Sequence, residues 1–359
     1  MKIEAYIVIF YVYLLLLLFL AAINSKRKDI VFSSFLIIYI STAFRSDYIN
    51  DDALNYSFYF SDVSNYSSFF ELLNSYYWGK VEIGFKALLY SVASIFPAGS
   101  TTIPFKLSIV MIEAGVFYYL YKSWAYKSHA SIVVFLYFYT CFFLVINDLA
   151  IIRFSIAAMF VLIAANRFLS YSRKLDSYVG VGALLVAGSF HLAALLFSIA
   201  FFYYYLVYTK KHRYIYMHIP FLFVPFAANQ IPNLSHGMSS YYQNVVVNAD
   251  GTGFGYRNMV EVCVFLILLF QNRSRRVFTP VLFSFYVYMF FLILEIFVGI
   301  YVFNRMRILS WMVFLFFISF FWGKIRKESR VFVLMYAFMF FLIQTYELPE
   351  IWNNSINNL

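Results

Sequence analysis

The sequence predicts an all-α fold, a polytopic bundle of transmembrane helices. Of its 359 residues, 63% are hydrophobic and only 12% are charged, whereas an ordinary soluble domain has about 45–50% and about 25%. Too few polar side chains remain to cover a water-facing surface of this size. Long apolar runs recur along the chain, most of them close to the ~20 residues that a membrane crossing needs. These observations exclude a water-soluble globular protein.

Helices are favoured over strands because several runs are apolar on all sides. Residues 14–20, for example, read Leu-Leu-Leu-Leu-Leu-Phe-Leu. A membrane β-barrel would instead show segments of ~10 residues in which apolar and polar side chains alternate. We therefore expect one integral membrane domain over residues 1–359, with about 11–13 helical segments, some of them re-entrant or half-helices.

The basic residues orient this bundle. Lys and Arg gather in short segments between the apolar runs, and such segments are cytoplasmic by the positive-inside rule. This distribution accounts for the net charge of +10 without a nucleic-acid partner, and leaves membrane lipids as the expected contacts. The basic segments cover residues 26–28, 173–174, 210–213, 273–276 and 324–330.

With these segments inside, the chain can be threaded in order. Residues 6–23 form a retained first crossing with Met1 outside, because the basic residues follow the run. Residues 30–44 then lead outward to a first periplasmic loop, 45–80, which is rich in acidic residues. A second periplasmic loop, rich in Gly, Asn and Ser, covers 229–256. Further crossings are expected at 214–228, 257–270, 277–303, 308–322 and 331–346.

Two segments do not fit simple crossings. Residues 177–208 lie between two cytoplasmic segments and are long for one crossing, so we expect a hairpin of two short half-helices. Its break is expected near Gly180, Gly182 and Gly188, just before His191. A crossing by residues 81–97 would invert the orientation of everything downstream, so a re-entrant or interfacial helix is expected there.

Signatures of soluble enzymes are absent from the sequence. It contains no HExxH, CxxC, GxSxG, P-loop or DxD motif, so no metal site and no cofactor are predicted. Cys141 and Cys263 both lie inside apolar runs and are expected to be packing residues. The glycines of 251–255 follow no strand and indicate a flexible loop.

Ionisable residues at or near the outer ends of the predicted helices stand out instead. An arginine at a helix centre costs roughly 2.5–3.5 kcal/mol on insertion scales, so charges near this depth indicate a cavity inside the bundle. Several arginines, a carboxylate cluster and one histidine around such a cavity describe an anion site with a candidate base. The set comprises Arg45, Asp47, Asp51, Asp52, Glu82, Asp148, Arg153, His191, Tyr256, Arg257, Arg305 and Arg307.

Each of these residues also has a structural explanation. Arg45 and Arg257 could snorkel to outer headgroups. Arg153 could pair with Asp148, and His191 could be a neutral histidine bonded to a backbone carbonyl. The acidic residues could be solvated. Arg305 and Arg307 could be ordinary loop residues, because Asn304-Arg-Met-Arg307 is expected to join two crossings.

Four short motifs occur in order along the chain. They are Arg-x-Asp-x-x-x-Asp-Asp at 45–52, Glu82-Ile-Gly-Phe, Ile152-Arg153-Phe-Ser-Ile-Ala and Phe190-His191-Leu-Ala-Ala-Leu. Together they resemble the EpsG/Wzy family of polysaccharide polymerases. The resemblance spans about residues 40–200 and continues loosely to the turn at 304–307. The sequence departs from the family at Phe154 and Asn50, where Gln and Gly are usual.

The resemblance implies a multi-pass enzyme of the bacterial inner membrane whose active site faces the periplasm. Such a glycosyltransferase joins O-antigen, capsule or exopolysaccharide repeat units carried on undecaprenyl pyrophosphate, with a chain-length regulator and a flippase as candidate partners. Arginine forks can stabilise the pyrophosphate leaving group without a metal. On this interpretation, Arg45, Arg153, Arg257, Arg305 and Arg307 bind the pyrophosphate. His191, Asp51 or Asp52 is the base, and Asp47, Glu82, Asp148 and Tyr256 support the site.

Two other functions remain open at this point. A flippase for a lipid-linked oligosaccharide would also need cationic groups inside a bundle, but it should show related halves and charges near the midplane. The sequence shows no internal repeat, and its charges favour one face. An O-acyltransferase is a third possibility, although no pair of cytoplasmic histidines is present.

Overall fold

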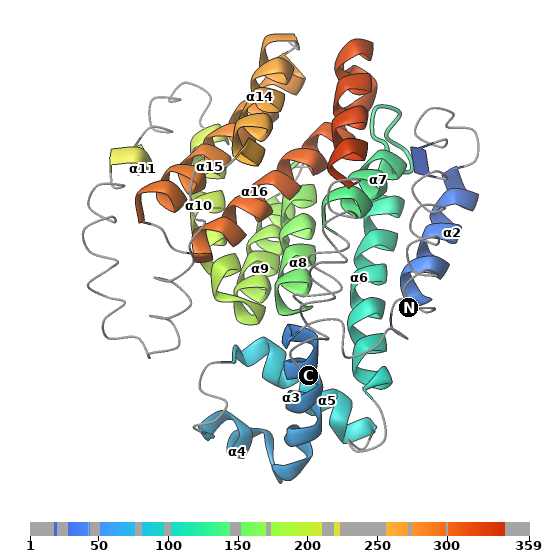
Figure 1. Cartoon of the computed structure of the whole chain (residues 1–359), viewed down its shortest axis with the longest axis vertical. Coiled ribbons are helices and arrows are strands. Elements are labelled where there is room, and N and C mark those ends of the chain that lie inside the picture. The colour runs from blue at the N-terminus through green and yellow to red at the C-terminus, as the bar shows by residue number, and fades with distance from the viewer. Residues whose placement is uncertain are drawn as a thin grey trace.

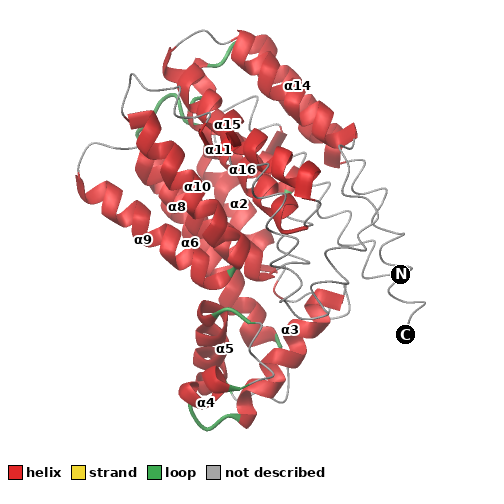
Figure 2. Ribbon diagram, turned by 90° about the vertical axis from the view of Figure 1, so that its left-hand side faces the viewer, coloured by secondary structure: helices red, strands yellow, loops and turns green. Residues whose placement is uncertain are grey.

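A computed structural model of the chain confirms the all-α prediction. It describes residues 18–19, 28–41, 43, 51–75, 81–96, 102–143, 152–169, 174–209, 219–222, 256–271, 275–298 and 301–341. Within these ranges the chain forms helices, turns and short loops and no strand (Figure 2). Of the second predicted periplasmic loop, 229–256, residues 229–255 lie outside the described part of the chain.

The helices divide into an upper bundle and a smaller unit below it (Figure 1). The lower unit contains α3 (Asp51–Asp62), the short turn η4 (Val63–Asn65), α4 (Phe69–Asn74) and α5 (Ile83–Ile95). The bundle contains α2 (Lys28–Ser41), α6 (Ile103–Trp124), α7 (Ile132–Phe142), α8 (Ile152–Leu169), α9 (Lys174–Phe190), α10 (Leu192–Thr209), α11 (Ile219–Leu222), α14 (Tyr256–Gln271), α15 (Arg275–Val298), α16 (Tyr301–Phe320) and a helix over 327–341, with the turn η7 (Trp322–Lys324) between the last two.

Two helices form the centre of the bundle because α7 and the part of α16 from Ile308 to Phe320 are apolar on nearly every side. Every residue of α7 is buried, and so is every residue of α16 from Met306 to Phe320. A helix with no polar face can be stable only when other helices surround it. Aromatic rings fill much of this core, for instance Trp311 packed edge-on against Phe142 at 5.8 Å between ring centroids.

Among the described residues, one helix is both long and apolar enough to cross a membrane. This helix is α6, Ile103–Trp124, with a mean hydropathy of 1.4 in its most apolar window. Seven shorter apolar helical segments of 10–17 residues accompany it.

The lower unit has a small core of its own. Phe60 stacks on Phe105 at the start of α6, with 5.5 Å between ring centroids, and Phe85 of α5 meets the same ring edge-on. α5 therefore packs with α3 and α4 in the lower unit, and it also contacts the bundle through α6 and the end of α9. Residues 45–80, expected as a loop, are helical over most of their described part.

The hairpin expected at 177–208 is present, but its break lies at a different residue. The hydroxyl of Ser198 in α10 donates to the carbonyl of Leu184 in α9 at 3.3 Å, which only antiparallel neighbours allow. α9 and α10 are 17 and 18 residues long, so they are not short half-helices. α9 continues through all three glycines and ends at Phe190, so the chain turns at His191.

Candidate active site

His191 joins two helices and uses its backbone and side chain to cap both. Its N–H donates to the carbonyl of Ala187 at 3.2 Å, which closes the last turn of α9. Its carbonyl accepts from Ala194 N–H at 3.0 Å, and its ring atom Nδ1 accepts from Ala193 N–H at 3.1 Å. The ring thus satisfies an N–H of the first turn of α10 that has no intrahelical partner.

Arg305 approaches the other ring nitrogen of His191 from a different helix. Its Nη1 lies 3.2 Å from Nε2 of the imidazole. The segment 304–307 was expected to be a turn, which is wrong, because α16 begins at Tyr301 and carries Arg305 in its second turn. Arg305 and Arg307 can stay within a helix because each has a partner of its own, His191 and Glu261 respectively.

Phe154 supports both groups. Its ring lies edge-on to the imidazole of His191, with 5.4 Å between centroids, and the Arg305 guanidinium carbon is 6.0 Å from the Phe154 centroid. Phe154 is fully buried. Phe154 stands where the motif it resembles usually has Gln. Its aromatic ring fixes the orientation of the imidazole by packing against it.

Arg153 enters the same region from the first turn of α8. Its Nη1 lies 2.5 Å from a carboxylate oxygen of Glu82, the residue that precedes α5. The guanidinium carbon lies 5.7 Å from the ring centroid of Tyr56 and 5.8 Å from that of Phe85, within cation–π range. Its Nε is buried and has no hydrogen-bond partner, so this arginine retains donor capacity.

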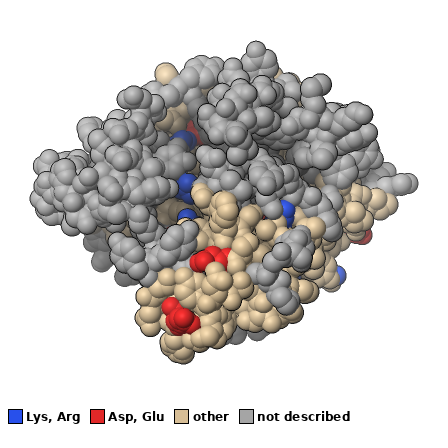
Figure 3. All heavy atoms as spheres, turned by 60° about the horizontal axis from the view of Figure 1, so that its bottom comes forward, with Lys and Arg blue, Asp and Glu red and all other residues tan. Residues whose placement is uncertain are grey.

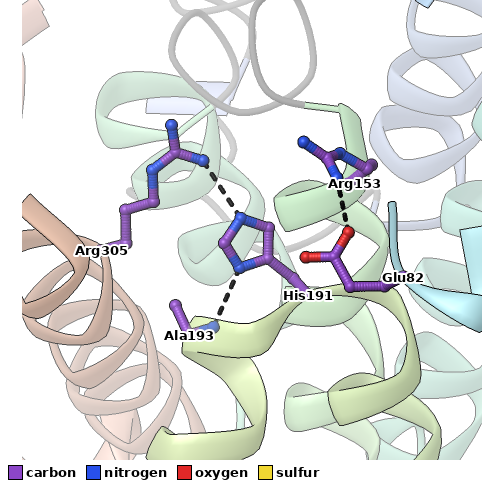
Figure 4. Close-up of polar contacts among 5 residues, drawn as sticks. All are labelled: Glu82, Arg153, His191, Ala193 and Arg305. Atoms are coloured by element: carbon purple, nitrogen blue, oxygen red, sulfur yellow. Dashed lines mark hydrogen bonds and ion pairs between the residues drawn. The ribbon is translucent and has the colours of Figure 1, made fainter. Parts of the chain in front are cut away.

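The two guanidinium groups flank the imidazole of His191. Figure 4 shows Arg305 on one side of the ring and the Arg153–Glu82 pair on the other, with both guanidinium groups extending toward the same side. The charges of both arginines act on the ring. Basic side chains are also visible at the surface when the molecule is viewed from the end that carries α3, α4 and α5 (Figure 3). The arrangement can bind an anion.

Arg307 does not join this cluster. It lies two residues beyond Arg305, about 200° around a helix, and so faces the opposite way. Its Nη1 lies 2.6 Å from the carboxylate of Glu261 in α14, and the Tyr288 hydroxyl of α15 donates to the same carboxylate. Both charged groups are buried, with 5% and 0% of their side-chain surface exposed. In the structure, Arg307 thus forms an interhelical ion pair.

The remaining predicted residues are placed only in part or not at all. Asp51 and Asp52 begin α3, and Tyr256 and Arg257 begin α14, but their side chains lie outside the described part of the structure. Arg45, Asp47 and Asp148 also lie outside it. Of the predicted set, the structure brings together Glu82, Arg153, His191 and Arg305.

Sequence reasoning missed two buried carboxylates, Glu261, the partner of Arg307, and Glu113. Glu113 of α6 is 1% exposed and accepts hydrogen bonds from the hydroxyls of Tyr39 in α2 and Ser155 in α8. A lone acidic residue in the middle of an apolar run was the available signal. In the described ranges, no three His, Cys, Asp or Glu residues lie close enough together to hold a metal ion.

Comparisons with known proteins identify the family of the chain. No curated protein and no solved structure matches the chain. A family model, that of the EpsG family, matches residues 30–358, which is nearly the whole length. The chain therefore belongs to the EpsG family of Wzy-type polymerases, membrane proteins of polysaccharide biosynthesis.

Proposed function

We propose that this protein polymerises lipid-linked glycan repeat units at the outer face of the bacterial inner membrane. It transfers a glycan chain from undecaprenyl pyrophosphate to a sugar hydroxyl of another lipid-linked unit. The observation that carries this proposal is the meeting of Arg153, His191 and Arg305 at one end of the bundle. Family membership supports the polymerase class, and the cluster supports the diphosphate as its ligand.

The reaction needs the groups that this cluster offers. The hydroxyl oxygen of the acceptor sugar attacks the anomeric carbon, and the bond from that carbon to the diphosphate breaks. The electron pair of the broken bond stays on the diphosphate, whose negative charge therefore increases in the transition state. Guanidinium forks bind phosphate oxygens through two parallel N–H groups, and their hydrogen bonds strengthen as that charge develops. We propose that no metal ion is required for this step.

The position of the cluster supports an outward-facing site. α16 begins near His191 with Arg305 and ends at Phe320, so the basic residues that follow it lie at the far end of the bundle. α6 ends there too, because Lys127 lies 4.6 Å from the Phe320 ring centroid. Under the positive-inside rule, the end that carries these lysines and Arg326 is cytoplasmic. The arginine cluster then opens to the periplasm.

The proton of the attacking hydroxyl must pass to a base within hydrogen-bonding reach. Asp51 and Asp52 remain candidates because they begin α3, whose Tyr56 ring has its centroid 5.7 Å from the guanidinium carbon of Arg153. Arg45 and Arg257 stay as proposed additional ligands of the diphosphate. Undecaprenyl-linked oligosaccharide is the proposed substrate, and a flippase and a chain-length regulator are the proposed partners.

A gene deletion separates the polymerase from a flippase. Loss of a polymerase leaves single repeat units on the cell surface, visible as one band on a polysaccharide gel. Loss of a flippase leaves no surface glycan. We expect the single-unit band, and we expect complementation with Arg305→Ala to give the same band at wild-type protein abundance. Absence of all surface glycan in the deletion strain would refute the polymerase assignment.

A further inference from the structure

The two ring nitrogens of His191 each face an N–H group. Ala193 N–H points at Nδ1 from 3.1 Å, and Arg305 Nη1 lies 3.2 Å from Nε2. A neutral imidazole has one nitrogen that accepts and one that donates, so it can accept a hydrogen bond from only one of these two groups. The surroundings decide which nitrogen holds the proton.

The rigid donor determines the tautomer. Ala193 N–H is part of the α10 backbone in its first turn, where no carbonyl of the same helix can accept from it, and Ala193 is fully buried. This N–H cannot rotate away from Nδ1, and burying it without a partner would be unfavourable. Arg305, by contrast, carries five N–H groups on a flexible chain and can turn to another acceptor. Nδ1 therefore accepts from Ala193, and Nε2 carries the proton.

We propose that His191 is a hydrogen-bond donor to the substrate diphosphate through its Nε2–H, paired with Arg305, and that it is not the base of the reaction. In this tautomer two N–H donors lie side by side, with 3.2 Å between their nitrogen atoms, and one acceptor placed next to both would satisfy them. An oxygen of an anionic phosphate, with several lone pairs, accepts from both. The identity of this anion as the diphosphate of a lipid-linked glycan rests on the proposed function.

The assignment changes where the proton goes in the transfer step. Nδ1 is occupied by Ala193 N–H, and Nε2 already holds a proton, so neither nitrogen can take the proton of the attacking hydroxyl. That proton passes to a carboxylate, for which the aspartates at the start of α3 are the candidates. The electron pair released from the broken sugar–oxygen bond stays on the diphosphate, whose charge the His191 and Arg305 N–H groups stabilise.

Three substitutions of His191 separate a donor from a base. In His191→Gln, the side-chain amide places an N–H near the position of Nε2 but cannot act as a base. In His191→Asn, the carbonyl oxygen can still accept from Ala193 N–H, as a good helix N-cap does, but the distal N–H is lost. His191→Ala removes both functions and serves as the reference for complete loss.

The readout is polymerisation by purified protein in nanodiscs, supplied with a lipid-linked repeat unit. A donor role predicts that the Gln variant keeps activity within about tenfold of wild type, while the Asn and Ala variants lose about 100-fold or more. The pH dependence of the Gln variant should match that of wild type. Loss of about 100-fold in both Gln and Asn variants, as expected for a missing base, would overturn the assignment. Full activity of all three would overturn it as well.

Two further measurements keep the outcome interpretable. Should the Gln variant fail to accumulate in membranes, binding of inorganic pyrophosphate to the Asn variant decides. We expect about tenfold weaker binding than wild type, and equal binding refutes the donor role. Arg305→Ala, tested in parallel, separates the two proposals. If Arg305→Ala retains polymerisation, the proposed diphosphate site is refuted. If both Arg305→Ala and His191→Gln lose polymerisation, only the donor role of His191 is refuted.

Discussion

Arg153 and Glu82 form an ion pair that joins the start of α8 to the start of α5. Their closest atoms are 2.5 Å apart, and about a fifth of each side chain is exposed, 23% and 21%. Glu82 occupies the N-cap position of α5, yet its carboxylate makes no capping bond to that helix. Its bond to Arg153 instead holds the lower unit against the bundle and orients one guanidinium of the proposed diphosphate site.

Arg153 and Glu82 should contribute unequally to the polymerisation rate. Arg153→Ala removes a donor to the leaving group, so we expect a loss of about 100-fold or more in polymerisation rate. Glu82→Gln keeps the size of the side chain but removes the charge that orients Arg153, so we expect a loss of about tenfold. The double variant Glu82→Gln/Arg153→Ala should be no worse than Arg153→Ala. Rates measured in nanodiscs test this, and additive losses would contradict a shared role.

Gly84 permits the close approach of α5 to the end of α9. A Cβ atom at this position would lie 2.5 Å from Ser189 Oγ and 2.9 Å from the Ser189 carbonyl oxygen. Gly84→Ala should therefore push α5 away, with a destabilisation of about 1–3 kcal/mol and shortened glycan chains. Gly182→Ala is the matched control, because nothing lies within 4 Å of its Cβ position. Equal chain lengths in the two variants would show that this contact does not position the site.

Arg305 and Arg307 should behave differently although they are neighbours on one helix. Arg305→Ala should abolish long chains at normal protein abundance. Arg307→Ala leaves Glu261 as a buried carboxylate without its cation, at a cost of about 3–5 kcal/mol, so the protein itself should disappear from membranes. Immunoblots of membranes measure the protein abundance of the two variants. The double variant Arg307→Ala/Glu261→Ala should be more abundant than Arg307→Ala, and the opposite order would contradict a structural pair.

The contrast between these two arginines also shows the limit of sequence reasoning. Both were assigned to a polar turn and to the same ligand, because Asn304-Arg-Met-Arg307 reads as a loop between two apolar runs. The two side chains point in opposite directions because the helix already begins at Tyr301. Their tertiary partners, His191 for Arg305 and Glu261 for Arg307, stabilise this helical start, and the sequence does not reveal such partners.

Other parts of the fold follow from simple patterns. The all-α class and the hairpin at 177–208 could be predicted from composition and from the spacing of basic segments. The break of the hairpin could not, because a glycine costs a helix only about 1 kcal/mol, which packing easily offsets. Gly180 and Gly188 serve close contact instead, since a Cβ would lie 2.5 Å from the Phe168 ring and 2.8 Å from Leu195 Cδ1, respectively.

Lys86 offers a test of the lower unit. Its side chain is only 5% exposed, and within the described part of the chain its ammonium group has no hydrogen bond or ion pair. Replacing it by the apolar side chain of methionine should stabilise the protein by about 1 kcal/mol. Lys106, buried to a similar degree but with a partner, is the matched control, and Lys106→Met should destabilise.

Thermal unfolding in detergent measures both lysine variants. A lower midpoint for Lys86→Met than for wild type would contradict the idea of an uncompensated buried charge. Loss of polymerisation in Lys86→Met at normal abundance would do so too, since it would place the ammonium group at the substrate.

Binding of undecaprenyl pyrophosphate to the purified protein in nanodiscs tests the central claim most directly. The reaction product is the probe, wild type is compared with the double variant Arg153→Ala/Arg305→Ala, and native mass spectrometry gives the bound fraction across a titration. If the two guanidinium groups bind the diphosphate, the double variant should bind at least about 100-fold more weakly. Equal affinity of the two proteins would contradict the proposed site.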